Sequence, residues 1–145
     1  MPYFTEPEQA LDYFYNLLNT NKTTLGIKYV GYADENILPQ YPAVVVSYNT
    51  PIDRRIHATR QFQLEWALQF MVYHARLTAS HKTRTKEDMQ LAKAVRDLLH
   101  TDHTLGGSVI FGFVQSERPG ILAGSKGQAT VATTLIWAGE SRATY

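Results

Sequence analysis

The 145-residue sequence contains no cysteine. A disulfide framework is therefore excluded, and so is any thiolate site such as a zinc finger or an iron–sulfur cluster. The sequence also lacks an apolar run of the length that a transmembrane helix needs. Its first ten residues are acidic and polar, unlike a signal peptide. We therefore expect a protein that is made and used in a reducing cytoplasm and has no membrane partner.

A strong overall charge is missing too, since the formal net charge is +1. Bulk electrostatics therefore does not favour a polyanion-binding protein. The charge is unevenly spread, however, because residues 51–86 carry seven Lys and Arg against two acids, a net of +5. These bases are expected in loops at opposite ends of a long strand, where they either contact a partner or DNA, or are solvated, or pair with acids of a neighbouring subunit. The candidate partner-facing or DNA-facing residues are Arg54, Arg55, Arg60, Lys82, Arg84 and, in a later glycine-rich loop, Lys126.

No catalytic motif is present either. The sequence has no phosphate-binding G-x-x-x-x-G-K-[ST] loop, no G-x-S-x-G elbow and no H-E-x-x-H. The nearest metal-like cluster is His100-x-x-His103 with Asp102 between them. Histidines at this position also suit the negative end of a helix dipole, which is the interpretation we favour. We expect no catalytic residue, no metal and no cofactor, so the protein is predicted not to be an enzyme.

Hydrophobic periodicity predicts the secondary structure. Two helices are expected, at 6–19, with Thr5 as the cap and Glu8 at the capping-box position, and at 85–100. A glycine-rich turn is expected at 117–127, and none of the six prolines falls inside an expected strand. The predicted fold is a single α+β domain over 1–145, with a mostly antiparallel sheet of about five strands and two helices packed on one face, in the order α-β-β-β-α-β-β. The strands are expected at 26–33, 43–48, 60–76, 108–115 and 128–138.

The strand expected at 60–76 is unusually long. Its even positions, from Phe62 to Val72, are all large and apolar, which predicts one buried face. Seventeen residues would span about 55 Å at about 3.3 Å each, more than the width of a domain of this size. The strand is therefore either bent within one sheet, or it projects and pairs with another chain. In the second case its later odd positions form a subunit interface, and the candidate residues are Ala67, Gln69, Met71 and Tyr73.

Several of these segments together resemble a known family. An N-terminal helix precedes a hairpin containing Ala43–Tyr48, and the long strand follows. The most specific part is a helix ending in Leu98-Leu99 and followed by the pattern D-x-T-L-G-G-x-V at residues 102–109, and the final pair of strands ends in Leu135-Ile136-Trp137. In this order the chain resembles the tail terminator (tail completion) proteins of long-tailed bacteriophages.

The resemblance implies a virion protein of the tail and neck region, assembled in the host cytoplasm. It implies a homohexameric ring that caps the tail tube, stops the polymerisation of the tail tube protein, and joins the tail to the head connector. DNA would pass through the ring without sequence-specific binding, and no cofactor would be needed. A ring closes through a contact between two different surfaces of the subunit, and a projecting strand could supply one of them.

Three alternatives stay open from the sequence. A head-closure or neck adaptor protein would occupy the adjacent ring of the same virion. A small nucleic-acid-binding module would use the basic loops. An enzyme could hold an active site whose members are distant in sequence.

Overall fold

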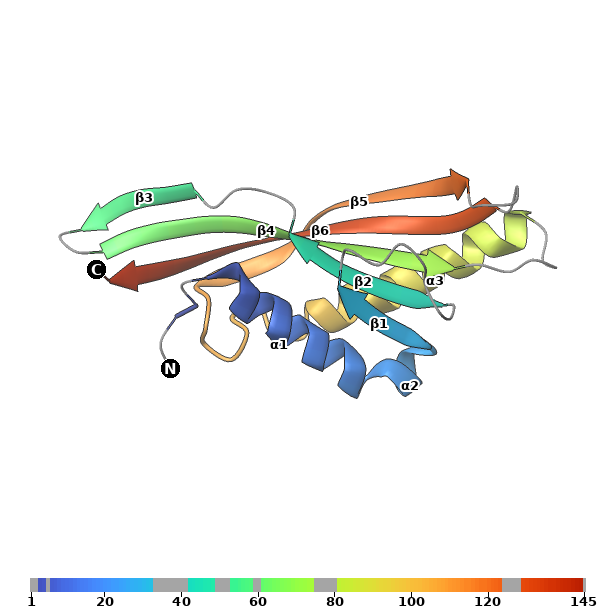
Figure 1. Ribbon diagram of the computed structural model, residues 1–145, viewed down its shortest axis with the longest axis horizontal. Helices are drawn as coiled ribbons and strands as arrows, with labels where there is room; N and C mark the ends of the chain where they lie inside the picture. The colour runs from blue at the N-terminus through green and yellow to red at the C-terminus, as the bar shows by residue number, and fades with distance from the viewer. Residues whose placement is uncertain are drawn as a thin grey trace.

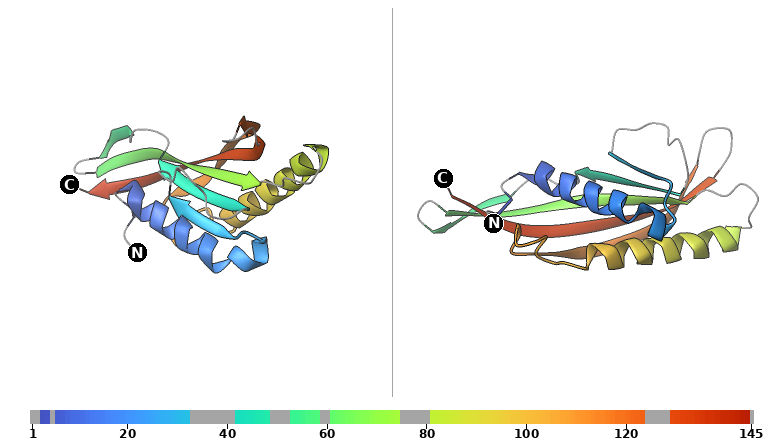
Figure 2. Two further views of the ribbon diagram at one scale, coloured as in Figure 1. Left: turned by 45° about the vertical axis from the view of Figure 1, so that its right-hand side comes forward. Right: turned by 90° about the horizontal axis from the view of Figure 1, so that it is seen from below.

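The computed structural model describes residues 3–4, 6–32, 42–48, 53–58, 61–74, 81–123 and 129–144. Within them, two long helices lie along the strands of one sheet and cover the same face of it (Figures 1 and 2). The helices are α1 (Pro7–Thr20), α2 (Lys22–Leu25) and α3 (His81–Leu99). The strands are β1 (Tyr29–Tyr32), β2 (Ala43–Tyr48), β3 (Asp53–Ala58), β4 (Gln61–His74), β5 (Phe111–Ala123) and β6 (Ala129–Thr144).

The six strands form one sheet in the order β1-β2-β4-β6-β5, and β3 also pairs with β4. Only the pairing of β1 with β2 is parallel, and the other pairings of the described strands are antiparallel. The predicted α+β class is therefore confirmed, with a mostly antiparallel sheet and two long helices on one face. The parallel pair contradicts the expected hairpin at Ala43–Tyr48, because β1 and β2 run in the same direction and cannot be joined by a tight turn.

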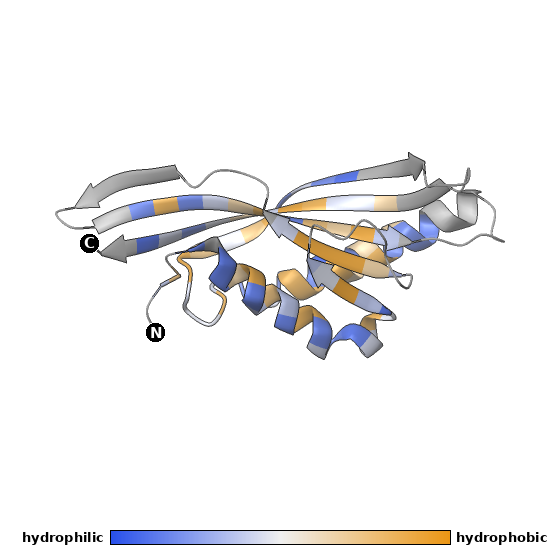
Figure 3. Cartoon of the chain, viewed as in Figure 1, coloured by the Kyte–Doolittle hydropathy of each residue, from blue (hydrophilic) through white to orange (hydrophobic). Residues whose placement is uncertain are grey.

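The core lies between the sheet and the two long helices. Phe14 of α1 packs edge-on against Phe70 of β4 and Trp137 of β6, with ring centroids 5.2 and 5.0 Å apart. Val95 and Leu99 bring α3 onto the same cluster. Both helices are amphipathic, so burying one stripe of each against the sheet leaves their polar residues in water (Figure 3).

Glycines make room for the largest core side chain. The indole of Trp137 lies over Gly112 of the neighbouring strand, and a Cβ added to Gly112 would sit 1.9 Å from the Cζ2 atom of Trp137. The same ring also covers Gly139, two residues along its own strand, where an added Cβ would be 2.4 Å from the ring. Trp137 can therefore be fully buried only because these two positions carry no side chain.

The helix starts differ from the predictions. Pro7 is the first residue of α1, where its missing N–H is not needed, and the Glu6 N–H donates to Gln9 Oε1 at 3.1 Å. Gln9, and not Glu8, therefore closes the first turn, while the predicted cap Thr5 lies outside the described residues. α3 begins at His81, four residues before the predicted start, and α2 was not predicted at all.

Three strands occupy residues outside the strands that the sequence predicted. β3 occupies 53–58, where a basic loop was expected, and it is held by antiparallel pairing with β4. β5 continues to Ala123 through Pro119, so the turn expected at 117–127 is a strand as far as Ala123, and the expectation of no proline within a strand is wrong. β5 is an edge strand, where a proline is tolerated because half of the N–H groups point away from the sheet. β6 likewise runs to Thr144, beyond the predicted end at 138.

The long strand is central and has no free edge along most of its length. β4 has 14 residues, or about 46 Å at about 3.3 Å per residue. It pairs with β6 from Gln61 to His74, and its other edge is occupied first by β3 and then by β2. Of the two alternatives that the sequence left open, the strand within one sheet is therefore confirmed, and the projecting unpaired edge is wrong. What extends beyond the helices in Figure 1 is a three-stranded end of the sheet, made of β3 with the first part of β4 and the last part of β6.

Candidate assembly interface

The two faces of the sheet have different surroundings. The even residues of β4 from Leu64 to Val72 point toward α1 and α3 and are buried in the core, as the alternation predicts. The odd residues point to the opposite face, which no helix in the described part of the chain covers (Figure 2). We call this surface the open face. Its central residues, from four strands including β5, are Val45, Ser47, Ala67, Gln69, Met71, Tyr73, Phe113, Ser116, Arg118, Thr134, Ile136 and Ala138.

All four predicted interface residues lie on the open face. Ala67 is buried, whereas Gln69, Met71 and Tyr73 are half-buried. The strand register places Met71 between Val45 and Thr134. The Tyr73 hydroxyl donates to the Met71 sulfur at 3.3 Å, which ties two of these side chains together. The centre of the open face thus mixes apolar and polar side chains, and Arg118 of β5 lies beside Gln69 and Thr134 on it, a composition that protein interfaces also show.

Two exposed phenylalanines continue the open face onto the edge strand. Phe111 is 50% exposed and Phe113 is 43% exposed, and their register partners on β6 are Glu140 and Ala138. The two rings lie 5.8 Å apart. The imidazole of His103 stacks on Phe111, with centroids 4.9 Å apart and an interplanar angle of 15°. Phe111 is therefore held in place although half of it faces solvent.

The loop that carries His103 is tightly built. Asp102 Oδ1 accepts the Thr104 N–H at 2.9 Å and its hydroxyl at 2.8 Å, and Oδ2 accepts the Gly106 N–H at 2.7 Å. These hydrogen bonds lower the pKa of Asp102, with the Thr104 hydroxyl as the largest cause. Leu105, at a φ of 49°, is turned into the core. The pattern D-x-T-L-G-G-x-V thus has a structural role, since it folds a loop that closes the core beside β5.

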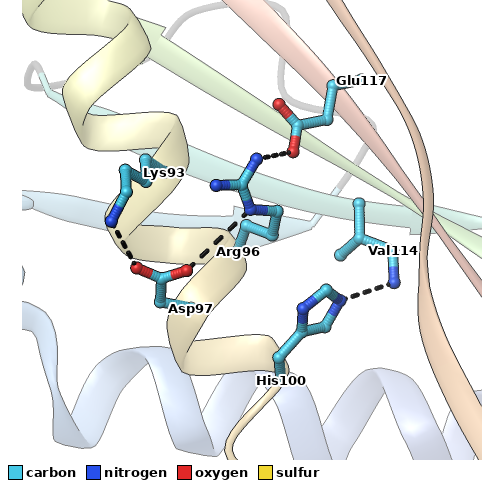
Figure 4. Close-up of polar contacts among 6 residues, drawn as sticks. All are labelled: Lys93, Arg96, Asp97, His100, Val114 and Glu117. Atoms are coloured by element: carbon cyan, nitrogen blue, oxygen red, sulfur yellow. Dashed lines mark hydrogen bonds and ion pairs between the residues drawn. The ribbon is translucent and has the colours of Figure 1, made fainter.

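Histidines also close part of the β5 edge. The Val114 N–H donates to His100 Nε2 at 2.9 Å (Figure 4). The Gly112 N–H donates to the His103 carbonyl at 2.9 Å, and its carbonyl accepts from His103 Nδ1 at 2.8 Å. Burial lowers the pKa of His100, and the nearby His103 and Arg96 lower it further. A lower pKa favours the neutral ring, and only the neutral ring has a nitrogen that can accept the Val114 N–H. The two histidines of the metal-like cluster thus form hydrogen bonds with the backbone of β5. The described residues contain no group of three metal-binding side chains.

An apolar groove lies on the helix side of β5. Its walls are α3 and the strands β5 and β6, and Met89 at its rim is 57% exposed. Across it, Arg96 Nη1 donates to Glu117 Oε1, a contact that raises the pKa of Arg96 (Figure 4). Lys93 pairs with Asp97 along the helix at 3.0 Å. The residues lining the groove are Met89, Gln90, Ala92, Lys93, Arg96, Glu117 and Thr133.

The predicted basic loops are not loops where the structure describes them. Arg54 and Arg55 belong to β3, while Lys82 and Arg84 belong to the first turns of α3. Arg60 and Lys126 lie outside the described residues, as do the side chains of the other four. β3 and the start of α3 lie at opposite ends of the molecule, as expected for segments that flank β4 (Figure 1).

Sequence reasoning missed the phenylalanine pair and the groove. The signal for the first was the spacing Phe111-Gly112-Phe113, which puts two aromatic residues on one face of a strand. It could not be recognised as a surface feature because the strand was read only as apolar. The groove has no sequence signal, since α3 contributes to it residues that are far from β5 and β6 in the chain.

Comparisons with known proteins support the fold alone. No protein-family model matches the sequence, and no curated protein matches it either. Twenty-eight chains of solved structures match the fold. One of them, whose name describes no function, is 15% identical, with a TM-score of 0.52, and the match covers 94% of this chain and 96% of the other. No helix in the described ranges is long and apolar enough to cross a membrane.

Proposed function

We propose that this chain is a structural protein that assembles with copies of itself into a ring, and that the ring is the tail terminator of a long-tailed bacteriophage. The observation that carries the assembly is the open face, a helix-free surface of apolar and polar side chains that is bordered by the exposed Phe111 and Phe113. A sheet usually buries its apolar surface against another layer. A neighbouring subunit supplies that layer here.

The family assignment within this proposal rests on the sequence resemblance, in particular on the pattern at 102–109. The ring caps the last layer of the tail tube, stops polymerisation of the tube protein, and presents its other side to the head connector. DNA passes through the lumen without base-specific contacts. In this role the protein functions by binding other proteins, without catalysis and without a cofactor.

Electron microscopy of the purified protein, alone and mixed with polymerised tail tubes, tests this proposal. We expect six-fold rings that bind at one end of each tube and halt its growth. Rings that bind connectors but never tubes would instead identify a head-closure adaptor. A protein that remains monomeric at high concentration and leaves tube length unchanged would contradict the proposal. Salt-sensitive binding of the monomer to duplex DNA would identify a nucleic-acid-binding module.

A further inference from the structure

We infer that Phe111 and Phe113 insert into the groove beside α3 of a second copy of this chain, and that this contact closes the ring. The inference rests on the proposed ring and names the two surfaces that meet in it. A ring requires a contact between two different patches of the subunit. The phenylalanine pair and the groove are two such patches, and they lie on opposite faces of the sheet.

The phenylalanine pair has the properties of an interface anchor. Phe111 and Phe113 are two of the most exposed large apolar side chains in the described residues. Phe111 is stacked on His103, whose ring is fixed by its hydrogen bond to the Gly112 carbonyl. Little conformational freedom therefore remains to be lost when a partner covers the ring, which favours binding. Aromatic side chains are also enriched among the residues that dominate binding energy.

The groove offers the matching concave surface. Ala92 and Met89 give it an apolar lining, and the exposed Met89 side chain is flexible enough to adapt to an aromatic ring. Its rim carries Lys93 and Arg96, whose charges are already paired, with Asp97 along the helix and with Glu117 across the groove. The apolar lining therefore suits an aromatic side chain better than a charged segment. An exposed aromatic pair and an apolar groove on the same chain favour a second copy as the occupant.

Strand addition at the β5 edge is the less favourable way for two copies to meet. His100 and His103 occupy the outward backbone groups at Gly112 and Val114. Farther along, Pro119 lacks the N–H that a pairing strand would need. Edge strands protected in this manner resist pairing with other chains. Contact through side chains of the face and the groove remains, and it places α3 of the second copy over the open face.

The test uses two variants that each destroy one surface. Phe111→Ser/Phe113→Ser removes the anchor, and Met89→Glu puts a charge at the groove. All three side chains are about half exposed or more, so both variants should fold, which circular dichroism checks. Sedimentation velocity of the full chain should show self-association weakened at least about tenfold in each. The controls are Tyr32→Ser, at the opposite edge of the sheet, and Asn16→Glu, an exposed position on α1, and both should assemble as wild type does.

Mixing the two defective variants gives the decisive result. The double phenylalanine variant keeps an intact groove, and Met89→Glu keeps intact phenylalanines, so the mixture should form heterodimers although neither variant assembles alone. No heterodimer in the mixture would overturn the pairing of these two surfaces. Rings formed normally by both variants would overturn the inference and leave the ring itself standing, even if such rings no longer bind tubes. A monomeric wild type would overturn the inference and the proposed function together.

Discussion

Neighbouring residues of β4 show how differently the two faces of one sheet are used. Phe70 has no exposed surface and packs against Phe14, whereas Met71, the next residue, is half-buried on the open face. Both belong to the same central strand and make the same kind of backbone pairing. The difference comes from what covers them, because the helices of the described residues cover one face only. Residues on the covered face determine folding, and residues on the open face are available for assembly.

Truncation of Phe70 and Met71, one at a time, tests this difference with the largest expected effect. Phe70→Ala should lower the free energy of unfolding by about 3–5 kcal/mol, because it leaves a cavity in the core. Met71→Ala should cost the monomer less than about 1.5 kcal/mol, since part of its surface is already in water. Urea denaturation at a concentration where the protein is monomeric measures both. Equal losses would mean that the open face is covered within the monomer.

Gly112 and Phe113 allow a second comparison, again between adjacent residues on opposite faces. Gly112→Ala should lower the free energy of unfolding by about 1–3 kcal/mol, because the added methyl group collides with the buried Trp137 ring. Phe113→Ala removes a whole ring that is 43% exposed, yet it should cost the monomer less. Thermal unfolding ranks the two variants. A larger loss from Phe113→Ala would show that this side chain belongs to the core.

The loop at 102–109 closes the core on the covered face, and the pH dependence of the free energy of unfolding tests its hydrogen bonds. The native pKa of Asp102 lies below its unfolded value, so its ionised form stabilises the folded state. That stabilisation is present above the unfolded pKa of about 3.9 and is lost as the pH falls through the native pKa. Asp102→Asn keeps an acceptor for Thr104 but loses the one for Gly106, so it should be less stable at pH 7 than the wild type. Denaturation between pH 7 and pH 2 should then show a smaller acid dependence in the variant.

His100 should give the smallest of these effects. Its pKa is lowered in the folded state, so the unfolded chain binds its proton more readily. The stabilisation from neutral His100 is present above the unfolded pKa of about 6.5 and falls as the pH drops toward the native value. NMR titration should show the His100 ring protonating below the usual range, together with a shift of the Val114 amide. A normal His100 titration that leaves the Val114 amide unchanged would contradict the capped edge.

Much of the covered face could be predicted from sequence. The alternation from Leu64 to Val72 assigned each residue of β4 to the correct side, and helical spacing found α1 and α3. β3 could not be predicted in this manner, because its charged sequence forms a strand only by pairing with β4. The continuation of β5 through Pro119 depends on its position at the edge of the sheet, which becomes known only when the strand order is known.

The candidate interface was predictable in part. Ala67, Gln69, Met71 and Tyr73 were placed on one face by their odd spacing, and the fold confirms that they share it. One reason given for their role, a projecting edge, was wrong, since β4 has partners on both edges, while their position on the second face of the strand holds. The exposure of Phe111 and Phe113 could not be predicted, because sequence does not show which side of an edge strand the helices leave uncovered.

The protection of a thiol on the open face from chemical labelling tests whether this face is buried when the protein assembles. The chain contains no cysteine, so Met71→Cys and Asn16→Cys each introduce a single reactive group. Maleimide labelling is followed from dilute to concentrated protein. The thiol at position 71 should become protected as the protein assembles, while the exposed position 16 on α1 should label at a constant rate. A thiol at position 71 that stays equally reactive in the assembled protein would contradict the assignment of the open face to assembly.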